Sequence, residues 1–271
     1  MATYCGVDFH ARQQLVKWCN TDDGEIHERQ LWHQSIDGVR EFYAQFKGEV
    51  IVGFETSGYS SWFEAMLEEL GHQVWIGHAT EIRRRARARQ KTDRRDAELI
   101  LDLLLKNEFP RIHRVSAESR EVLRQLRYRH RLVQQRTRSY NSLQAIALGA
   151  GVSLKAKLRT RKGKERLLGL SVTETQSRQR QEWLDLIVQL NGYIERVEKE
   201  LELIAEADER VQLVRTHPGV GLLTGLALVH TLSPVSRFAN SRKVAAYVGL
   251  EPREYSAPVA QGGTKSALFC N

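Results

Sequence analysis

Two short apolar segments of this chain each end in a carboxylate, and this arrangement limits the folds that the chain can adopt. Residues 50–54 form a continuous apolar run that ends in Glu55, which predicts a strand buried on both faces. Residues 4–8 form a second apolar segment, which ends in Asp8. If the two strands are neighbours, their ends lie side by side. The sequence therefore favours an α/β fold with acidic side chains at one end of a sheet.

The first 110 residues alternate between strand and helix patterns. Residues 4–8 and 14–19 read as a hairpin, and a third strand is expected around residues 28–33. Short apolar runs at residues 50–54 and 74–76 predict two more strands. Helical spacing is found at residues 36–46, at residues 62–70 before Gly71, and at Asp93–Leu105. A meander followed by alternating helices and strands predicts a mixed α/β layer fold.

The middle of the chain is rich in helix-forming and charged residues. Residues 116–148 and 171–207 contain few helix breakers, and a glycine turn and the basic segment 155–164 separate them. Apolar residues keep a spacing of three to four, at Leu123, Leu126 and Tyr128 and then from Trp183 to Val197. This pattern predicts a long helical hairpin or coiled coil. A plain helical bundle has equal weight, and both alternatives predict helices that pair.

The composition changes again near residue 211. An HPGVG turn at residues 217–221 is followed by an apolar helix at Leu222–Leu232. Such a turn resembles a helix-hairpin-helix element, in which Gly219 and Gly221 would offer backbone N–H groups to a phosphate. A turn that only connects two packed helices is the alternative. We therefore predict three domains, at residues 1–110, 111–208 and 209–271.

Charge and cysteine content limit the classes of function. The 271 residues carry a formal net charge of +8, which indicates an acidic partner, most simply nucleic acid. A membrane surface is the weaker interpretation, because no apolar run approaches the roughly 20 residues that span a bilayer. The three cysteines are scattered without CxxC spacing, which argues against a zinc site and suits a reducing compartment. We expect a cytoplasmic protein.

Four carboxylates form a candidate metal site: Asp8, Glu55, Asp93 and Asp96. Asp93 and Asp96 are three residues apart, so they share one face of a helix. A two-metal phosphoryl-transfer site needs carboxylates from several elements, because Mg²⁺ prefers oxygen ligands. Taken singly, each residue has a structural alternative as a turn or helix-cap residue. Their joint placement favours the metal site and is the pattern of a ribonuclease H-like fold.

Arginines are concentrated between residues 83 and 95, where the first acidic residue is Asp93. A solvated helix face is the ordinary explanation for a run of charges. The density here favours contact with the phosphates of a nucleic acid. The residues expected to make that contact are Arg83, Arg84, Arg85, Arg87, Arg89 and Lys91.

Three N-terminal blocks and a C-terminal region carry a family resemblance. The blocks are GVD at residues 6–8, ETSGY at 55–59 and KTDRRDA at 91–97. The C-terminal matches are HPGVG at 217–221, RFANSR at 237–242 and YVGLEPREYS at 247–256. Together they resemble the DEDD transposases, insertion-sequence recombinases related to the Piv DNA invertases. The resemblance covers nearly the whole chain.

This resemblance implies more than the residues themselves show. It implies an N-terminal domain similar to the Holliday-junction resolvase RuvC, a helical coiled-coil middle, and a small α-helical C-terminal transposase domain. In such recombinases the four acids bind Mg²⁺, and a serine of the C-terminal domain attacks the phosphodiester to form a covalent serine–DNA intermediate. The implied partners are donor and target DNA, a structured guide RNA called a bridge RNA, and further copies of the chain in a dimer or tetramer.

The C-terminal end departs from the family pattern. The family has one or two serines at this point, followed by glycine and a basic tail, whereas here Ser256 is followed by Ala257 and Pro258. Ser256 is the candidate nucleophile, and the alternative places the usual serine position at Ala257. The expected explanation is an altered or truncated C-terminus.

Three functions remain open at this point. The first is an RNA-guided, Mg²⁺-dependent transposase or site-specific recombinase with a serine nucleophile. The second is a non-catalytic nucleic-acid-binding remnant of such a transposase. The third is a metal-dependent junction nuclease, which would use the acids without a serine.

Overall fold

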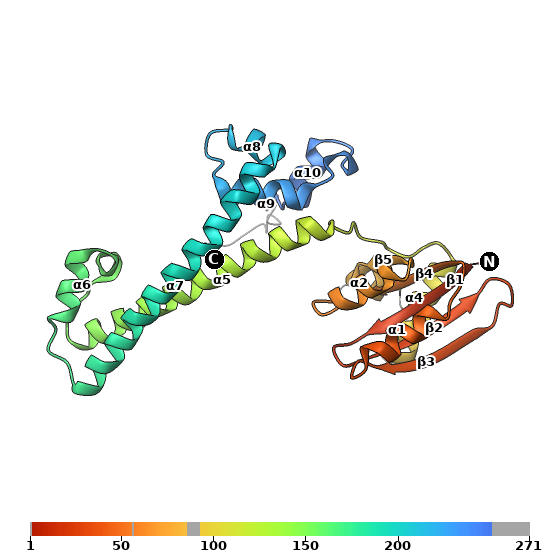
Figure 1. Ribbon diagram of the computed structural model, residues 1–271, viewed down its shortest axis with the longest axis horizontal. Coiled ribbons are helices and arrows are strands. Elements are labelled where there is room, and N and C mark those ends of the chain that lie inside the picture. Colours follow the sequence, from red (N-terminus) through yellow and green to blue (C-terminus); the bar gives the residue numbers. More distant parts are fainter. Residues whose placement is uncertain (1, 56, 86–92, 251–271) are drawn as a thin grey trace, which may run out of the picture. The chain divides into compact units, whose positions relative to one another are not determined.

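Residues 2–55, 57–85 and 93–250 are described by a computed structural model, the side chains of Asp93 and Ala156 excepted (Figure 1). The chain divides into two compact units, residues 1–114 and 115–271. The predicted further division of the second unit near residue 208 stays a prediction. Predictions that fall on Arg87, Arg89, Lys91 and Ser256 lie outside the described residues.

The first unit is built on a mixed five-stranded sheet with strand order β3-β2-β1-β4-β5. β1 pairs antiparallel with β2 and parallel with β4; β2 pairs antiparallel with β3, and β4 pairs parallel with β5. The α/β class and the antiparallel meander are therefore confirmed. The strands are β1 (Ala2–Phe9), β2 (Gln13–Asn20), β3 (Ile26–Trp32), β4 (Glu49–Glu55) and β5 (Gln73–Gly77).

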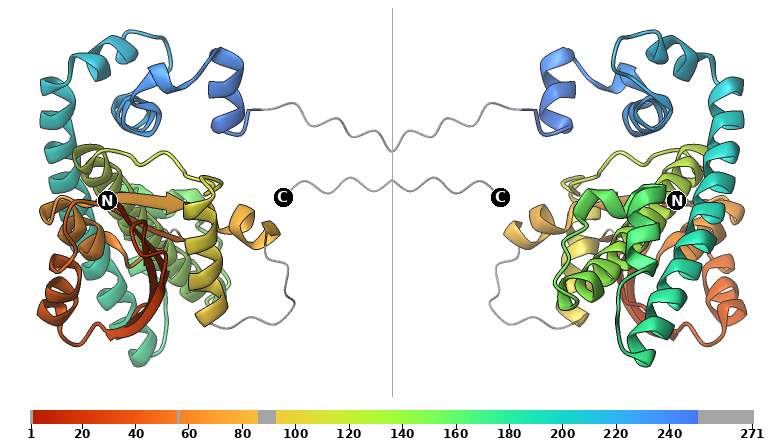
Figure 2. Two further views of the ribbon diagram at one scale, coloured as in Figure 1. Left: turned by 90° about the vertical axis from the view of Figure 1, so that its right-hand side faces the viewer. Right: turned by 90° about the vertical axis from the view of Figure 1, so that its left-hand side faces the viewer.

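Helices cover both faces of this sheet (Figure 2). On one face, Cys5 and Val7 of β1 share a buried cluster with Phe42 and Phe63, from the helices drawn in orange. On the other face, Ile51 of β4 packs against leucines of the helix drawn in yellow. Burial of the strand at residues 50–54 is confirmed. The helices of this unit are α1 (Ile36–Ala44), α2 (Ser61–Glu69), α3 (Ala79–Arg85) and α4 (Asp93–Leu105).

Two glycines let α4 lie directly on the sheet. A Cβ atom at Gly6 would lie 2.4 Å from the backbone nitrogen of Leu101 and 2.5 Å from the carbonyl oxygen of Ala97. A Cβ atom at Gly53, on the neighbouring strand β4, would lie 2.8 Å from a methyl carbon of Leu104. Only glycine permits so close an approach of helix and strand. The backbone of α4 is therefore held at a fixed place over β1 and β4.

Two long antiparallel helices form the body of the second unit and lie side by side (Figure 1). They are α5 (Ala117–Gly149) and α7 (Glu174–Ala207). Their buried residues share two clusters, one around Leu201 and one around Leu143. The expected helix pairing is confirmed, and the coiled-coil form of that pairing stays a prediction.

The contact face of α5 differs in part from the prediction. Val122 is buried and Leu126 packs against the same cluster, whereas Tyr128 is exposed. Tyr128 follows Leu126 by only two residues, so the two side chains point in different directions on a helix. The prediction that Tyr128 belongs to the apolar face was therefore wrong.

Short helices occupy the two ends of this hairpin. η1 (Lys155–Arg159) and α6 (Arg161–Leu168) lie in the connection between α5 and α7. At the other end, α9 packs against both α5 and α7. None of the helices in the described ranges combines the length and the apolar character needed to span a bilayer. The remaining elements are α8 (Glu209–Arg215), α9 (Leu222–Leu232), η2 (Val235–Arg237) and α10 (Ser241–Tyr247).

Candidate active site

Asp8 and Glu55 lie at the same end of two adjacent parallel strands. The register of β1 and β4 pairs Val7 with Phe54, and Asp8 and Glu55 are the next residue on each strand. Side chains alternate between the faces of a strand, so Asp8 lies on the face of Gly6, and Glu55 on that of Gly53. Both carboxylates therefore belong to the sheet face that α4 covers.

The first turn of α4 comes to this same end of the sheet. Leu104, near the end of the helix, packs beside Ile51, and Ala97 lies over Gly6. The helix therefore runs opposite to β1, and its N-terminal turn lies toward Asp8. That turn carries Asp93 and Asp96. The predicted acidic residues thus come from three elements that meet at one sheet end.

Two basic residues contact the strand-end acids. His10 Nε2 lies 2.9 Å from Asp8 Oδ2, and Arg83 Nη2 lies 3.7 Å from Glu55 Oε2. The Asp8 side chain is 15% exposed and that of Glu55 is 31% exposed. Sequence reasoning missed the role of His10, although its position two residues after Asp8 places both on one strand-end turn. Both acids are accessible to a small cation.

Ion pairs attach α4 to β2 and β3. Lys17 Nζ, on β2, lies 2.8 Å from Glu98 Oε2 and 3.8 Å from Glu28 Oε2, and its side chain is only 12% exposed. Arg94 of α4 also pairs with Glu28 of β3. These contacts link residues far apart in sequence, and no local pattern indicated them. Arg94 precedes Asp96 by two residues and Glu98 follows it by two, so the ion pairs attach α4 to the sheet on both sides of Asp96.

The donor set fits a hard divalent cation. Carboxylate oxygens are the ligands that Mg²⁺ prefers, and like charges at one sheet end are stabilised by a cation between them. Within the described side chains, which exclude that of Asp93, no three His, Cys, Asp or Glu groups lie close enough together to hold a metal ion. The positions of the three elements, rather than a formed coordination shell, support the site.

The arginines predicted to bind nucleic acid begin in the last turn of α3. Arg83 contacts Glu55, Arg84 Nη1 lies 2.6 Å from Glu81 Oε1, and Arg85 donates to the carbonyl oxygen of Glu108. Arg83 and Arg84 are about 70% exposed. This part of the basic stretch therefore starts beside the acidic end of β4.

Gly219 and Gly221 lie in the turn between α8 and α9, as predicted. Gly219 has a φ of +86°, which favours glycine, and Gly221 is the residue that precedes the first turn of α9. A Cβ atom at either position would meet nothing within 4 Å. The positive φ explains why residue 219 is a glycine. The phosphate contact of this turn stays a prediction.

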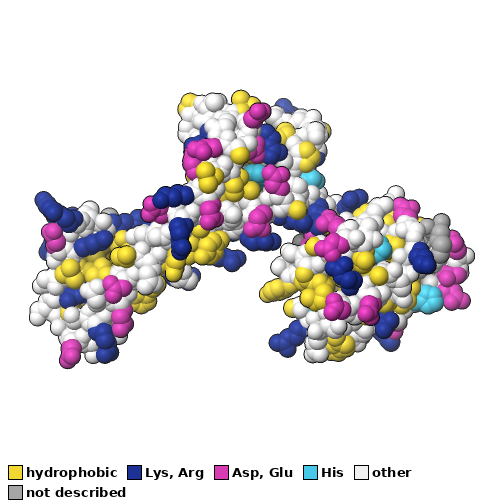
Figure 3. Space-filling view, viewed as in Figure 1, with side chains coloured by type: hydrophobic (Ala, Val, Ile, Leu, Met, Phe, Trp, Pro, Cys, Tyr) yellow, Lys and Arg dark blue, Asp and Glu magenta, His cyan; other side chains and the backbone are white. Residues whose placement is uncertain are grey.

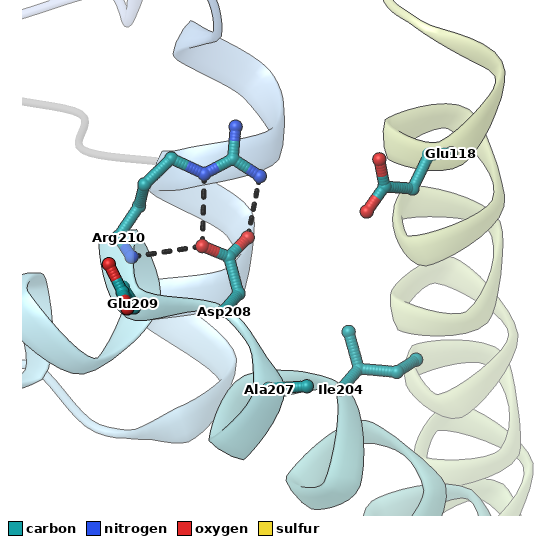
Figure 4. A pocket seen from close by; sticks show the side chains of 6 residues that line it. All are labelled: Glu118, Ile204, Ala207, Asp208, Glu209 and Arg210. Carbon is teal, nitrogen blue, oxygen red and sulfur yellow. Dashed lines mark hydrogen bonds and ion pairs between the residues drawn. The ribbon is translucent and has the colours of Figure 1, made fainter.

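A second polar cluster joins α5, α8 and α9. Asp208 immediately precedes α8 and accepts two hydrogen bonds from the Arg210 guanidinium. It also lines an open pocket of about 540 Å³, which Glu118 of α5 faces (Figure 4). The Arg210 hydrogen bond lowers the pKa of Asp208, and Asp208 in turn raises the pKa of Arg210. Buried His230 of α9 places Nδ1 3.0 Å from Ser119 Oγ and Nε2 3.9 Å from Asp208 Oδ2. Burial lowers the pKa of His230.

Comparison with known proteins identifies the family. A family model described as a transposase, for DEDD transposases of the IS110 type, matches residues 5–150. A second model, described as the transposase IS116/IS110/IS902 family, matches residues 211–265. The first match alone covers more than half of the chain and includes the sheet end with its acidic residues. The chain belongs to the IS110-type transposase family.

Curated relatives agree with this assignment. The transposase of insertion element IS1111A from Coxiella burnetii is 28% identical over 183 residues, which are 66% of this chain and 49% of that protein. A probable family 20 transposase from Pseudomonas aeruginosa is 25% identical over 80% of this chain and 65% of its own length. The transposase of IS1328 from Yersinia enterocolitica is 29% identical over 81% of this chain and 64% of its own. The chain thus spans about half to two thirds of these relatives.

Proposed function

We propose that this chain is the transposase of an insertion sequence, a site-specific recombinase that cleaves and rejoins DNA strands. The observation that carries the proposal is the meeting of β1, β4 and α4 at one sheet end, each with its acidic residues. The strand order and the placement of Asp8 on the first strand and Glu55 on the fourth support a ribonuclease H-like, RuvC-like domain.

Asp8, Glu55, Asp93 and Asp96 are the residues that would hold Mg²⁺. The bound ion would supply Lewis-acid stabilisation of charge on the phosphoryl oxygens. Arg83 lies against Glu55 and partly balances the negative charge at the sheet end, whereas His10 lies within hydrogen-bond distance of Asp8. Arg83 also stands at the start of the basic stretch, where it can orient a phosphate toward the acids.

The remaining parts of the proposal rest on the family resemblance. Ser256 would provide the nucleophilic hydroxyl. Its attack on phosphorus would form a serine–phosphate ester and break the bond from phosphorus to the neighbouring nucleotide, whose oxygen leaves as a DNA hydroxyl and takes up a proton equivalent to the one that the serine loses. A bridge RNA would select donor and target DNA by base pairing, and two or more copies of the chain would bring the strands together. The basic residues from Arg83 to Lys91 would contact nucleic-acid phosphates.

The metal site is tested by Asp93→Asn and Asp96→Asn in a strand-cleavage assay with Mg²⁺. Each variant should lower cleavage by about 100-fold or more, because loss of a ligand removes several kcal/mol of charge stabilisation. Asp102→Asn is the matched control: Asp102 lies on the same helix and pairs with Lys106 at 2.7 Å, beyond the acidic end. Cleavage that survives in Asp93→Asn would remove the metal-site proposal.

The serine step is tested by denaturing gels of the chain with Mg²⁺, labelled donor DNA and the RNA transcribed beside the gene. A protein–DNA adduct that disappears in Ser256→Ala supports the serine recombinase. Strand cleavage without an adduct indicates a junction nuclease. Binding of RNA or DNA without either product indicates a non-catalytic remnant.

A further inference from the structure

The connection between α5 and α7 carries much of the positive charge of the chain. We call residues 155–166 the basic tip; it holds seven basic residues and one acidic residue, a net charge of +6 against +8 for the whole chain. Lys and Arg side chains are visible over the end of the hairpin that carries α6 (Figure 3). Lys164 is half-buried, and the others are exposed: Lys155, Lys157, Arg159, Arg161, Lys162 and Arg166.

Protein groups neutralise little of this charge. Among the described residues of the tip, Arg161 Nε pairs with Glu165 Oε1 at 3.6 Å, between side chains that are 88% and 62% exposed. An ion pair so exposed contributes little to stability. The Arg159 guanidinium lies 5.4 Å from the ring centre of Tyr140 on α5, which holds the group in place and leaves its charge uncompensated. The tip is therefore a concentrated cationic surface.

The backbone of the tip is fixed by packing and hydrogen bonds. Leu154, Leu158 and Leu167 are each at most 2% exposed and belong to the cluster around Leu143. The Gln144 side chain of α5 accepts hydrogen bonds from the backbone nitrogens of Leu154, at 3.2 Å, and Lys155, at 2.6 Å. Cations on a fixed backbone lose less freedom when they bind than cations on an unfolded tail.

Close backbone packing within the tip adds to this order. A Cβ atom at Gly163 would lie 1.8 Å from the carbonyl oxygen of Lys157, so α6 and η1 are in direct backbone contact. The Thr160 hydroxyl accepts a hydrogen bond from the Gly163 nitrogen at 3.1 Å and begins α6. The two short helices thus present their lysines and arginines as one unit.

We propose that the basic tip, which belongs to the second unit, binds the phosphodiester backbone of a nucleic-acid duplex. The tip contains no aromatic residue, the main platform on which the bases of a single strand stack, so its chemistry favours the phosphates of a duplex. Phosphate contacts by lysine and arginine need no base sequence, and they position a duplex rather than read it. The proposal rests on the proposed function in that it takes the substrate of the chain to be nucleic acid.

The test measures binding of the full chain to a labelled 30-base-pair duplex DNA and, separately, to a duplex RNA of equal length, across a salt series. The triple variant Arg161→Gln/Lys162→Gln/Arg166→Gln should bind at least about tenfold more weakly at low salt. The slope of log affinity against log salt concentration should become less steep by about 2 to 3, because each lost phosphate contact reduces that slope by about 0.9. The duplex for which the triple variant loses affinity, DNA or RNA, is the one that the tip binds.

The matched control removes three charges elsewhere on the same unit: Arg124→Gln/Arg178→Gln/Lys199→Gln. Each of these residues is exposed on α5 or α7 and pairs with a glutamate of its own helix. The control should bind within about twofold of the unaltered chain, and the conservative variant Lys157→Arg/Lys162→Arg should keep full affinity.

Equal losses in the control and the tip variant would overturn the proposal, because net charge alone would then explain them. Unchanged affinity and salt dependence in the tip variant, with both duplexes, would also overturn it. Duplex binding by Asp93→Asn separates the two proposals: this variant should bind within about twofold of the unaltered chain, whatever the cleavage assay shows. Circular dichroism of each variant confirms that α5 and α7 remain folded.

Discussion

Gly6 shows how one residue positions the candidate site. It lies two residues before Asp8 on β1, and it has no side chain where α4 crosses the strand. The helix turn with Asp93 and Asp96 reaches the sheet end because its backbone can touch the strand here. Sequence reasoning used this residue as part of a motif, but the contact itself joins residues more than 90 positions apart. No local pattern could reveal it.

We therefore expect Gly6→Ala to disturb both stability and the site. The added methyl group would meet backbone atoms of α4 that cannot rotate away, so the helix must shift. Overpacking of this kind costs about 1–3 kcal/mol. Chemical denaturation should show the loss, and Mg²⁺-dependent cleavage should fall by more than the unfolded fraction explains.

Gly38→Ala is the control for this prediction. Gly38 lies in α1 of the same unit, and a Cβ atom there would meet Ser35 Oγ at an ordinary 3.4 Å. Alanine in a helix is more favourable than glycine by about 0.5–1 kcal/mol, so stability should be unchanged or higher. A Gly6→Ala protein as stable as this control would contradict the packing described for α4.

His230 makes the stability of the second unit depend on pH. Burial lowers its pKa below the ordinary value of 6.5, so the unfolded chain takes up a proton before the folded one does. The contribution of His230 to stability is therefore complete above pH 6.5 and is lost as the pH falls below it. Glu118, Asp208 and Arg210 are the charged groups that modify this pKa.

Thermal unfolding between pH 5 and 7.5 measures this effect. The melting temperature of the second unit should fall below pH 6.5 in the unaltered chain, and His230→Gln should flatten that part of the profile. His217→Gln, which removes an exposed histidine of the same unit, should leave the profile as it is. A steep fall that persists in His230→Gln would assign the pH dependence to other groups.

At the scale of elements, periodicity predicted what local sequence determines. The five strands, the helices α1, α2 and α4, and the long helices α5 and α7 lie where apolar spacing placed them, and Gly71, with a φ of +78°, follows α2 as expected. The exact face of α5 was harder, because charged residues interrupt its apolar stripe and Tyr128 lies outside it. α6 was missed, because its first turns read only as a basic segment. Partners such as His10 for Asp8 and Lys17 for Glu98 are tertiary and left no signal.

The pairing of α5 and α7 predicts a sharp contrast between two leucines of one helix. Leu201 is fully buried in the shared cluster, whereas Leu203 is 67% exposed. Leu201→Ala should destabilise the second unit by about 2–5 kcal/mol through lost burial and the cavity left behind. Leu203→Ala should change stability by less than about 0.5 kcal/mol. Equal effects of the two substitutions in a urea titration would contradict the observed helix face.

At the scale of the whole molecule, the described residues form separate hydrophobic cores. The two clusters around the sheet contain residues up to Ile112, and the two clusters of the helical hairpin begin at Val122. Each unit thus has a hydrophobic core of its own, as a separate cooperative unfolding transition requires.

Calorimetry of the full chain should therefore resolve two unfolding transitions. Leu67→Ala, in the core of the first unit, should lower the melting temperature of one transition, and Leu201→Ala that of the other. Each substitution should leave the melting temperature of the other transition within about 1–2 °C of its original value, because the altered residue packs in the core of its own unit. One transition that moves as a whole in both variants would show that the units unfold together.

The length of the helical hairpin determines how far apart the basic tip and the glycine turn between α8 and α9 lie. Its helices contain 33 and 34 residues, so at 1.5 Å per residue they extend about 50 Å, or roughly 15 base pairs of duplex at 3.4 Å each. Contacts with one duplex at the basic tip and at the glycine turn between α8 and α9 would be spaced by protein architecture rather than by base sequence. Removing seven residues from each helix keeps their packing register and shortens this span by about 10 Å. The protected region in a footprinting experiment would then contract by about three base pairs.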